Sequence, residues 1–148
     1  KADGYKPPAY WKCIAEIVDA INIPVVANGE IWNIRDWQQC KDESGCADFM
    51  VGRGLVACPD LALQIKAHNE QSDYQSMVWS DILILLNRFY YDTKDAYPLR
   101  FLGNRVKQWL FYLQMHYPEA IPFFEKIKRY KQPHEFEAIL GKKMASDG

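Results

Sequence analysis

The strongest constraint on the fold of this chain is an alternation of helical and strand-like segments that is confined to its first half. Apolar residues recur at helical spacing over residues 8–21, and the continuously apolar segment Ile23–Ala27 follows as a short buried strand. A helix over about Ile34–Glu43, a strand at Ala47–Val51 and a helical stretch to about His68 repeat the pattern. Such alternation with short connections is typical of parallel strands joined by crossover helices, so it predicts an α/β fold here.

The second half of the chain has no strand signal beyond a polar linker at residues 69–73. Its apolar residues instead form helical stripes, which predict a small antiparallel helical bundle. The stripes begin near Met77, Val106, Phe123 and Phe136. We therefore expect an α/β plus all-α protein with one domain at 1–70 and a second at 71–148.

Each of the two predicted strands ends in a glycine-containing turn. The first turn is Asn28-Gly29-Glu30 and the second is Gly52-Arg53-Gly54. Glycine allows the backbone to approach a ligand closely, and N–H groups in such turns can point at an anion. Arg53 can add a forked, charge-assisted contact to a phosphate. Tight turns alone would also explain the glycines, but their repetition beside an arginine favours a phosphate-bearing ligand.

Composition and cysteine usage exclude several classes of protein. No apolar run reaches the roughly 18 residues that a membrane-spanning helix needs. The four cysteines form no C-x-x-C pair and no His lies at metal-ligand spacing, which indicates reduced thiols in a cytoplasmic protein without a metal site. The chain starts with Lys1 in a polar loop, so we expect that the front of a longer protein is missing.

The charge is nearly neutral overall but is unevenly distributed. The net charge is −1, yet residues 100–131 contain seven basic and two acidic side chains. A local basic patch on a neutral protein suggests a polyanionic partner, although such a run is also typical of a solvated surface.

The stretch IPVVANGEIWNIRDWQQCKDESGCADFMVGRG is similar to the tRNA-dihydrouridine synthase family, in which a strand ending in A-N-G-D/E precedes a helix and G-C-D-x-x-M-x-G-R-G. The opening KADGYKPPAYW resembles the segment after that family's H-x-R-T motif, and RVKQWLFYL resembles a motif of its helical domain. Tyr5 and NGEIW resemble the bacterial C-type members, which act on uridine 16 of tRNA. The sequence departs from the family's G-C-D pattern at one position, because Ala47 lies between Cys46 and Asp48. This position is at the start of the second strand, away from the end where the ligand would bind.

The resemblance implies the last two βα units of a flavin-binding TIM barrel, followed by a helical tRNA-binding domain. It implies the reduction of a D-loop uridine of tRNA to 5,6-dihydrouridine by FMN, which NADPH recharges. The partner would be tRNA, with no DNA or membrane, and the full-length enzyme would be monomeric. The positions that match FMN-binding residues of the family are Asn28, Gly29, Glu30, Gly52 and Arg53.

The family's catalytic proton donor is a cysteine in the front half of the barrel. Cys13, Cys40, Cys46 and Cys58 do not lie in that motif, so we expect no catalytic residue in this chain. Two alternatives to a flavoenzyme stay open: an RNA-binding module without catalysis, and a different FMN-binding or phosphate-binding TIM-barrel enzyme.

Five residues are candidates for tRNA contacts. Arg105 and Tyr112 share one face of a predicted helix, whereas Lys107 must point to a different part of the RNA. Basic side chains would contact phosphates, and tyrosines would stack on splayed bases. Trp109 lies beside an apolar stripe and is expected in the core. The candidates are Tyr5, Arg105, Lys107, Tyr112 and Lys128.

Overall fold

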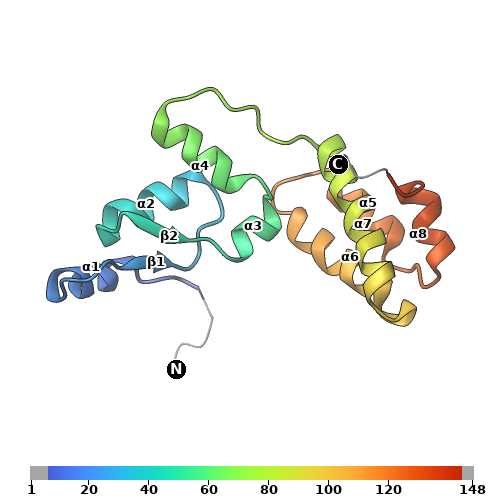
Figure 1. Ribbon diagram of the computed structural model, residues 1–148, viewed down its shortest axis with the longest axis horizontal. Helices are drawn as coiled ribbons and strands as arrows, with labels where there is room; N and C mark the ends of the chain where they lie inside the picture. Colours follow the sequence, from blue (N-terminus) through green and yellow to red (C-terminus); the bar gives the residue numbers. More distant parts are fainter. Residues whose placement is uncertain (1–6, 145–148) are drawn as a thin grey trace. The chain divides into compact units, whose positions relative to one another are not determined.

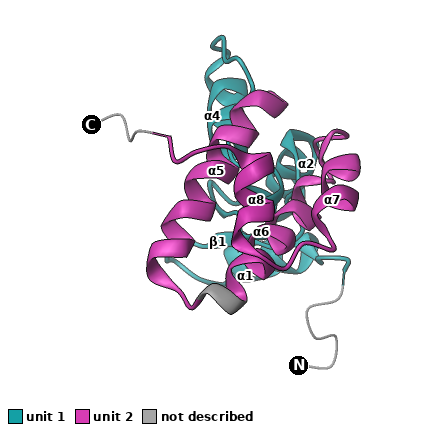
Figure 2. Ribbon diagram, turned by 90° about the vertical axis from the view of Figure 1, so that its right-hand side faces the viewer, with its two compact units in different colours: residues 1–76 teal, residues 77–148 magenta. Residues whose placement is uncertain are grey.

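The structure of the protein is a computed structural model that describes residues 7–144, apart from the side chains of residues 99 and 100. The chain divides into two compact units, residues 1–76 and residues 77–148 (Figure 2). The described part of unit 1 contains α1 (Trp11–Ala20), β1 (Val26–Asn28), α2 (Ile34–Ser44), β2 (Asp48–Met50), α3 (Arg53–Ala57) and α4 (Leu61–Glu70) (Figure 1). The described part of unit 2 contains α5 (Trp79–Ala96), α6 (Leu99–Leu113), α7 (Ala120–Ile127) and α8 (Pro133–Leu140).

Unit 1 is built on a parallel pair of strands, as the alternation of segments predicts. β1 pairs with β2 so that Ala27 lies opposite Phe49, and α2 forms the crossover between the two strands. Ala27 is buried against Trp37 and Cys40 of α2, and Trp11 of α1 completes the same cluster. Helices α1 and α2 therefore pack against the sheet and contribute much of the core of unit 1.

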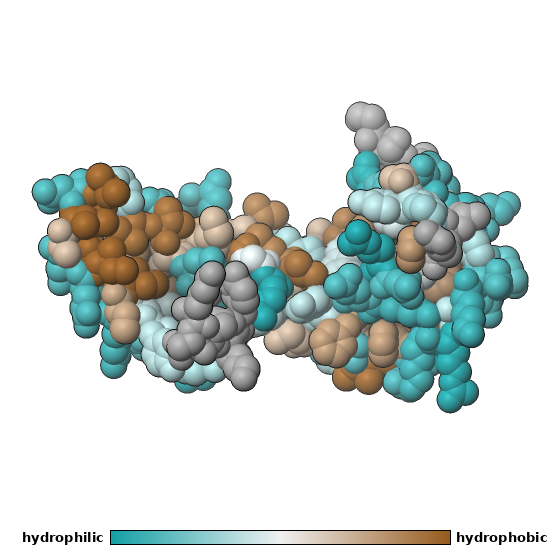
Figure 3. Space-filling view, turned by 90° about the horizontal axis from the view of Figure 1, so that it is seen from below, coloured by the Kyte–Doolittle hydropathy of each residue, from teal (hydrophilic) through white to brown (hydrophobic). Residues whose placement is uncertain are grey.

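The second face of this sheet is not covered by described residues. Val26 of β1 is 52% exposed and Met50 of β2 is 58% exposed, while Ile23 before β1 is 70% exposed. The strand predicted at Ile23–Ala27 is present only as Val26–Asn28, and it is buried on one face alone, because a fully buried parallel strand needs a layer on each face. Hydrophobic residues also gather at the end of unit 1 that holds α1 (Figure 3), where Ile17 is 51% exposed.

Local signals in the sequence explain where the helices of unit 1 begin and end. The Asn33 side chain accepts a hydrogen bond from the Asp36 N–H at the start of α2, and Gly45 ends α2 with a φ of 67°. Both roles follow from the sequence, because asparagine is a good N-cap and glycine tolerates a positive φ. The single helical stretch expected up to His68 is instead divided into α3 and α4, with Pro59 in the connection. Proline removes a backbone donor and clashes with the preceding turn of a helix.

Unit 2 is a bundle of α5, α6, α7 and α8 around an apolar core, as the stripes predict. Tyr90, Leu110 and Phe136 lie in this core, and Trp109 packs against it with its ring 5.0 Å from that of Phe89. Trp109 is therefore a packing residue, as expected. Within the described residues, no helix combines the length and apolarity required to cross a membrane.

Candidate functional site

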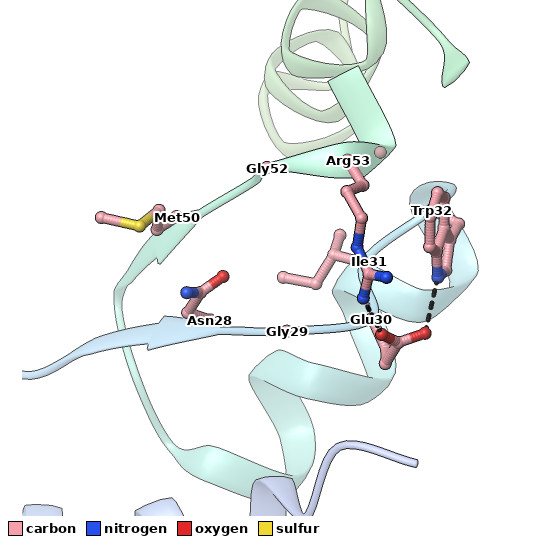
Figure 4. Close-up of a pocket in the computed structure, with 9 residues that line it drawn as sticks. Asn28, Gly29, Glu30, Ile31, Trp32, Met50, Gly52 and Arg53 are labelled. Atoms are coloured by element: carbon pink, nitrogen blue, oxygen red, sulfur yellow. Dashed lines mark hydrogen bonds and ion pairs between the residues drawn. The ribbon is translucent and has the colours of Figure 1, made fainter. Parts of the chain in front are cut away.

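The two glycine turns lie next to each other and line one cavity of about 340 Å³ (Figure 4). Parallel pairing of β1 and β2 brings their carboxyl ends to the same edge, so both turns leave the sheet there. The sequence predicts this juxtaposition, and the structure shows it. The lining residues are Asn28, Gly29, Glu30, Ile31, Trp32, Met50, Gly52, Arg53 and Gly54.

Close backbone approach holds the two turns together. A Cβ added at Gly54 would lie 2.0 Å from the Ile31 carbonyl oxygen, so only glycine fits there. Gly29 has a φ of 108°, which glycine adopts readily, and its carbonyl accepts a hydrogen bond from the Trp11 indole N–H at 2.9 Å. The first residue of α1 thereby fixes the turn after β1.

A carboxylate and a guanidinium meet at this cavity. Arg53 Nη2 donates to Glu30 Oε1 at 2.5 Å, and the Trp32 indole Nε1 donates to Glu30 Oε2 at 2.9 Å. The Arg53 side chain is 50% exposed, whereas the Glu30 side chain is 21% exposed. Both oxygens of Glu30 are thus engaged by protein groups, while Arg53 is half accessible. Trp32 is a site residue that the sequence analysis did not single out, although an aromatic residue two positions after Glu30 was a usable signal.

The start of α3 contributes N–H groups rather than a strong dipole. Arg53 and Gly54 are the first residues of this helix, so their backbone N–H groups have no intrahelical acceptor. With only five residues, α3 has little of the macrodipole that a longer helix provides. An anion here would therefore be bound by individual N–H groups and by the Arg53 side chain.

The candidates for tRNA contacts on α6 and just after α7 each contact a different neighbour. The exposed Arg105 guanidinium lies 5.2 Å from the Tyr97 ring centroid, and the half-buried Tyr112 ring makes an edge contact with Phe111. Lys128, which is exposed, forms an ion pair with Glu125. Tyr5 lies outside the described residues.

Lys107 points into unit 2 instead of out of it. Its Nζ donates to the Tyr130 carbonyl oxygen at 2.6 Å and lies 5.7 Å from the Phe136 ring centroid. Burial lowers the pKa of this amine. The contact ties α6 to the connection between α7 and α8, next to a cavity of about 540 Å³ that Asn104 and Lys131 also line.

Three of the four cysteines lie in the interior. Cys40, Cys46 and Cys58 are buried and Cys13 is exposed, and all four are free thiols. Burial raises the pKa of Cys40, which keeps its thiol protonated. Among the described residues, no group of three or more His, Cys, Asp or Glu side chains could hold a metal ion.

Comparison with known proteins identifies relatives over nearly the whole chain. Residues 1–146 match the sequence model of a family described as dihydrouridine synthase (Dus). A tRNA-dihydrouridine(16) synthase of Pseudomonas putida is 44% identical over 141 residues, which are 95% of this chain and 44% of that protein. Proteins with the same name from Ralstonia nicotianae and Haemophilus influenzae are 37% and 39% identical, over 98% and 97% of this chain and 44% and 45% of their own length.

The match extends through both units of the chain, but it spans less than half the length of these relatives. It includes both glycine turns and the basic helical segment in one alignment with a single family. The chain therefore belongs to the dihydrouridine synthase family.

Proposed function

We propose that this chain is part of a flavin-dependent tRNA-dihydrouridine synthase that reduces uridine 16 in the D-loop of tRNA. The observation that carries the proposal is the cavity between the two glycine turns, with Arg53 half exposed at its side. Relatives named tRNA-dihydrouridine(16) synthase support the choice of substrate.

The open face of the sheet supports a place for unit 1 in a larger barrel. Val26 and Asn28 of β1 and Met50 of β2 are exposed on the face that α1 and α2 do not cover. In the proposal, β1 and β2 are the last two strands of a TIM barrel, and this face is part of the barrel interior. TIM barrels commonly hold a phosphate in the loops after their last two strands, and in this proposal the cavity lies between those loops.

The residues around the cavity fit the phosphate end of FMN. Gly52 has open space where a Cβ would be, and the adjacent backbone N–H groups and Arg53 are donors that suit a phosphate. Asn28 and Gly29 would approach the phosphate or the ribityl chain from the other turn. When bound, FMN would supply hydride transfer, with NADPH as its reductant. The chain's own contribution is to bind and orient the cofactor.

Unit 2 would bind tRNA through the exposed cations of its helices. Arg105 and Lys128 are exposed and suit phosphate contacts, and Tyr112 on the same helix as Arg105 could stack on a base. We propose that the proton donor comes from a part of the complete protein outside this chain, and that the enzyme works as a monomer in the cytoplasm.

The test uses the complete protein, purified and assayed with tRNA that lacks dihydrouridine. The proposal predicts a flavin absorbance spectrum and NADPH-dependent formation of dihydrouridine at position 16. Flavin without any change in tRNA would favour another FMN enzyme, and tRNA binding without flavin would favour an RNA-binding module. Loss of the flavin absorbance spectrum in the Arg53→Ala variant would support the assignment of the cofactor site.

A further inference from the structure

The Arg53–Glu30 ion pair is part of a three-residue arrangement that also includes Trp32. Both oxygens of the Glu30 carboxylate accept hydrogen bonds, one from the Arg53 guanidinium and one from the Trp32 indole. The guanidinium carbon also lies 5.3 Å from the centroid of the Trp32 ring, within range of a cation–π interaction. Figure 4 shows the Arg53 side chain running from the start of α3 toward Glu30, with Trp32 beside it.

We propose that Glu30 and Trp32 are positioning residues, which hold the Arg53 guanidinium in place at the cavity for the ligand's phosphate. This inference rests on the proposed function, and it changes the expected role of Glu30 from a ligand contact to a support. A carboxylate beside a phosphate would repel it, unless the carboxylate's charge is engaged by an arginine, as it is here.

Arg53 can bind a phosphate while its guanidinium stays hydrogen-bonded to Glu30. A guanidinium has five N–H donors, and within the described residues Glu30 is the only acceptor of a side-chain hydrogen bond from Arg53. The side chain is half exposed, so its other donors are accessible. An arginine that is already ordered loses less rotamer freedom when a phosphate binds, which strengthens binding.

The support itself is fixed by the backbone. Glu30 has a φ of 54°, in the left-handed region that residues other than glycine rarely adopt, so the turn itself sets the direction of its side chain. The Trp32 N–H donates to Asp36 Oδ2 at 2.9 Å, which anchors Trp32 to the first turn of α2. The position of Arg53 thereby depends on a continuous set of contacts that runs from α2 through Trp32 and Glu30.

The test compares FMN with riboflavin, which lacks the phosphate, as ligands of the complete protein after removal of its flavin. Trp32→Phe keeps the aromatic ring and every charge, but it removes the donor to Glu30. We expect FMN to bind about 3- to 10-fold more weakly, because one hydrogen bond is lost. The affinity for riboflavin should change less than about twofold. Glu30→Gln should act in the same direction, because the neutral amide holds the guanidinium less firmly.

The same substitutions in an Arg53→Ala background give the decisive comparison. If Glu30 and Trp32 act through Arg53, neither substitution weakens FMN binding further once Arg53 is absent. Equal weakening of FMN and riboflavin in both backgrounds would overturn the inference, since it would indicate a ligand contact by Glu30 or a general structural role. Unchanged FMN binding in both variants would overturn it as well.

Two controls separate the inference from the function on which it rests. Trp79→Phe in α5 makes the same chemical change in unit 2 and should leave both dissociation constants unchanged. If the unsubstituted protein binds FMN and riboflavin equally and Arg53→Ala has no effect, the proposed phosphate site itself is wrong. If Arg53→Ala weakens FMN selectively but Trp32→Phe and Glu30→Gln do not, only the positioning role fails.

Discussion

At the scale of single residues, the site depends on backbone positions that accept no larger side chain. Gly54 lies against the Ile31 carbonyl, so the two turns are in direct contact across this position. A larger residue would have to push the turns apart and would change the cavity between them. On unit 2, Arg105 and Lys128 are exposed and Lys107 is not, so these three cations differ in their access to a nucleic acid.

Gly54→Ala should destabilise unit 1. The new methyl group would lie 2.0 Å from a backbone oxygen, and overpacking of this kind typically costs about 1–3 kcal/mol. Denaturant unfolding measures the change, with Leu63→Ala as a control because Leu63 is 52% exposed and its loss should cost about 0.5 kcal/mol or less. Equal stability of Gly54→Ala and the unsubstituted protein would show that the turns are not in contact.

Arg105→Ala and Lys128→Ala should each reduce the salt dependence of tRNA binding. A cation that contacts one phosphate contributes about one unit to the slope of log affinity against log salt concentration. Titration of the complete protein with tRNA at several salt concentrations measures this slope. A slope unchanged in both variants would contradict phosphate contacts at these positions.

At the scale of helices and strands, hydrogen bonds between elements hold unit 2 together. Lys107 ties α6 to the connection before α8, and Tyr90 of α5 donates to the Pro133 carbonyl oxygen at 3.1 Å and to Glu137 Oε1 at 3.2 Å. Lys94 adds an ion pair with Glu137 at 2.6 Å. These contacts join α5 and α6 to the end of the bundle.

Lys107→Ala should lower the stability of unit 2 by about 1–2 kcal/mol. The substitution removes a hydrogen bond to the Tyr130 carbonyl and the packing of the Lys107 stem near Phe136. Lys107→Met keeps most of the stem, so it should lose less stability. If Lys107→Met instead keeps full stability and flattens the salt dependence of tRNA binding, the residue contacts RNA as its sequence position first suggested.

Tyr90→Phe should reduce the sensitivity of unit 2 to alkaline pH. Burial, and secondarily the charge of Glu137, raise the pKa of Tyr90 above its ordinary value of 10.0. The folded state therefore keeps a proton that the unfolded state releases, so stability falls as pH rises above about 10. Phenylalanine cannot ionise and lacks this loss, although it costs about 1 kcal/mol at neutral pH through the missing hydrogen bonds.

Unfolding at a series of pH values up to about 11 tests this prediction. The difference in stability between the two proteins should shrink as pH rises, because the other tyrosines contribute equally to both. A constant difference would mean that Tyr90 ionises as readily in the folded state as in the unfolded one.

At the scale of the whole molecule, local features were predictable from the sequence, and side-chain directions were not. The cap at Asn33, the stop at Gly45 and the meeting of the two glycine turns follow from short-range signals and strand order. The inward direction of Lys107 depends on Tyr130, which lies 23 residues away, and no periodicity shows it. Trp32 was missed for a related reason, since its role depends on the position of Arg53 in the next βα unit.

In the proposed function, unit 1 would bind the cofactor and unit 2 would bind the nucleic acid. The open face of the β1–β2 sheet fits a barrel that the complete protein would close, in agreement with relatives more than twice as long as this chain. In this proposal, cofactor binding depends on the contact of the two glycine turns with a phosphate.

The most direct test is the ratio of riboflavin to FMN dissociation constants in the complete protein and in its Arg53→Ala variant. Arg35→Ala is the matched control, because Arg35 is an exposed arginine of the same unit that does not line the cavity. We predict a strong preference for FMN that falls by about tenfold or more in Arg53→Ala, since charge-assisted hydrogen bonds are worth about 1.5–3 kcal/mol. An equal preference in Arg53→Ala and Arg35→Ala would contradict the account.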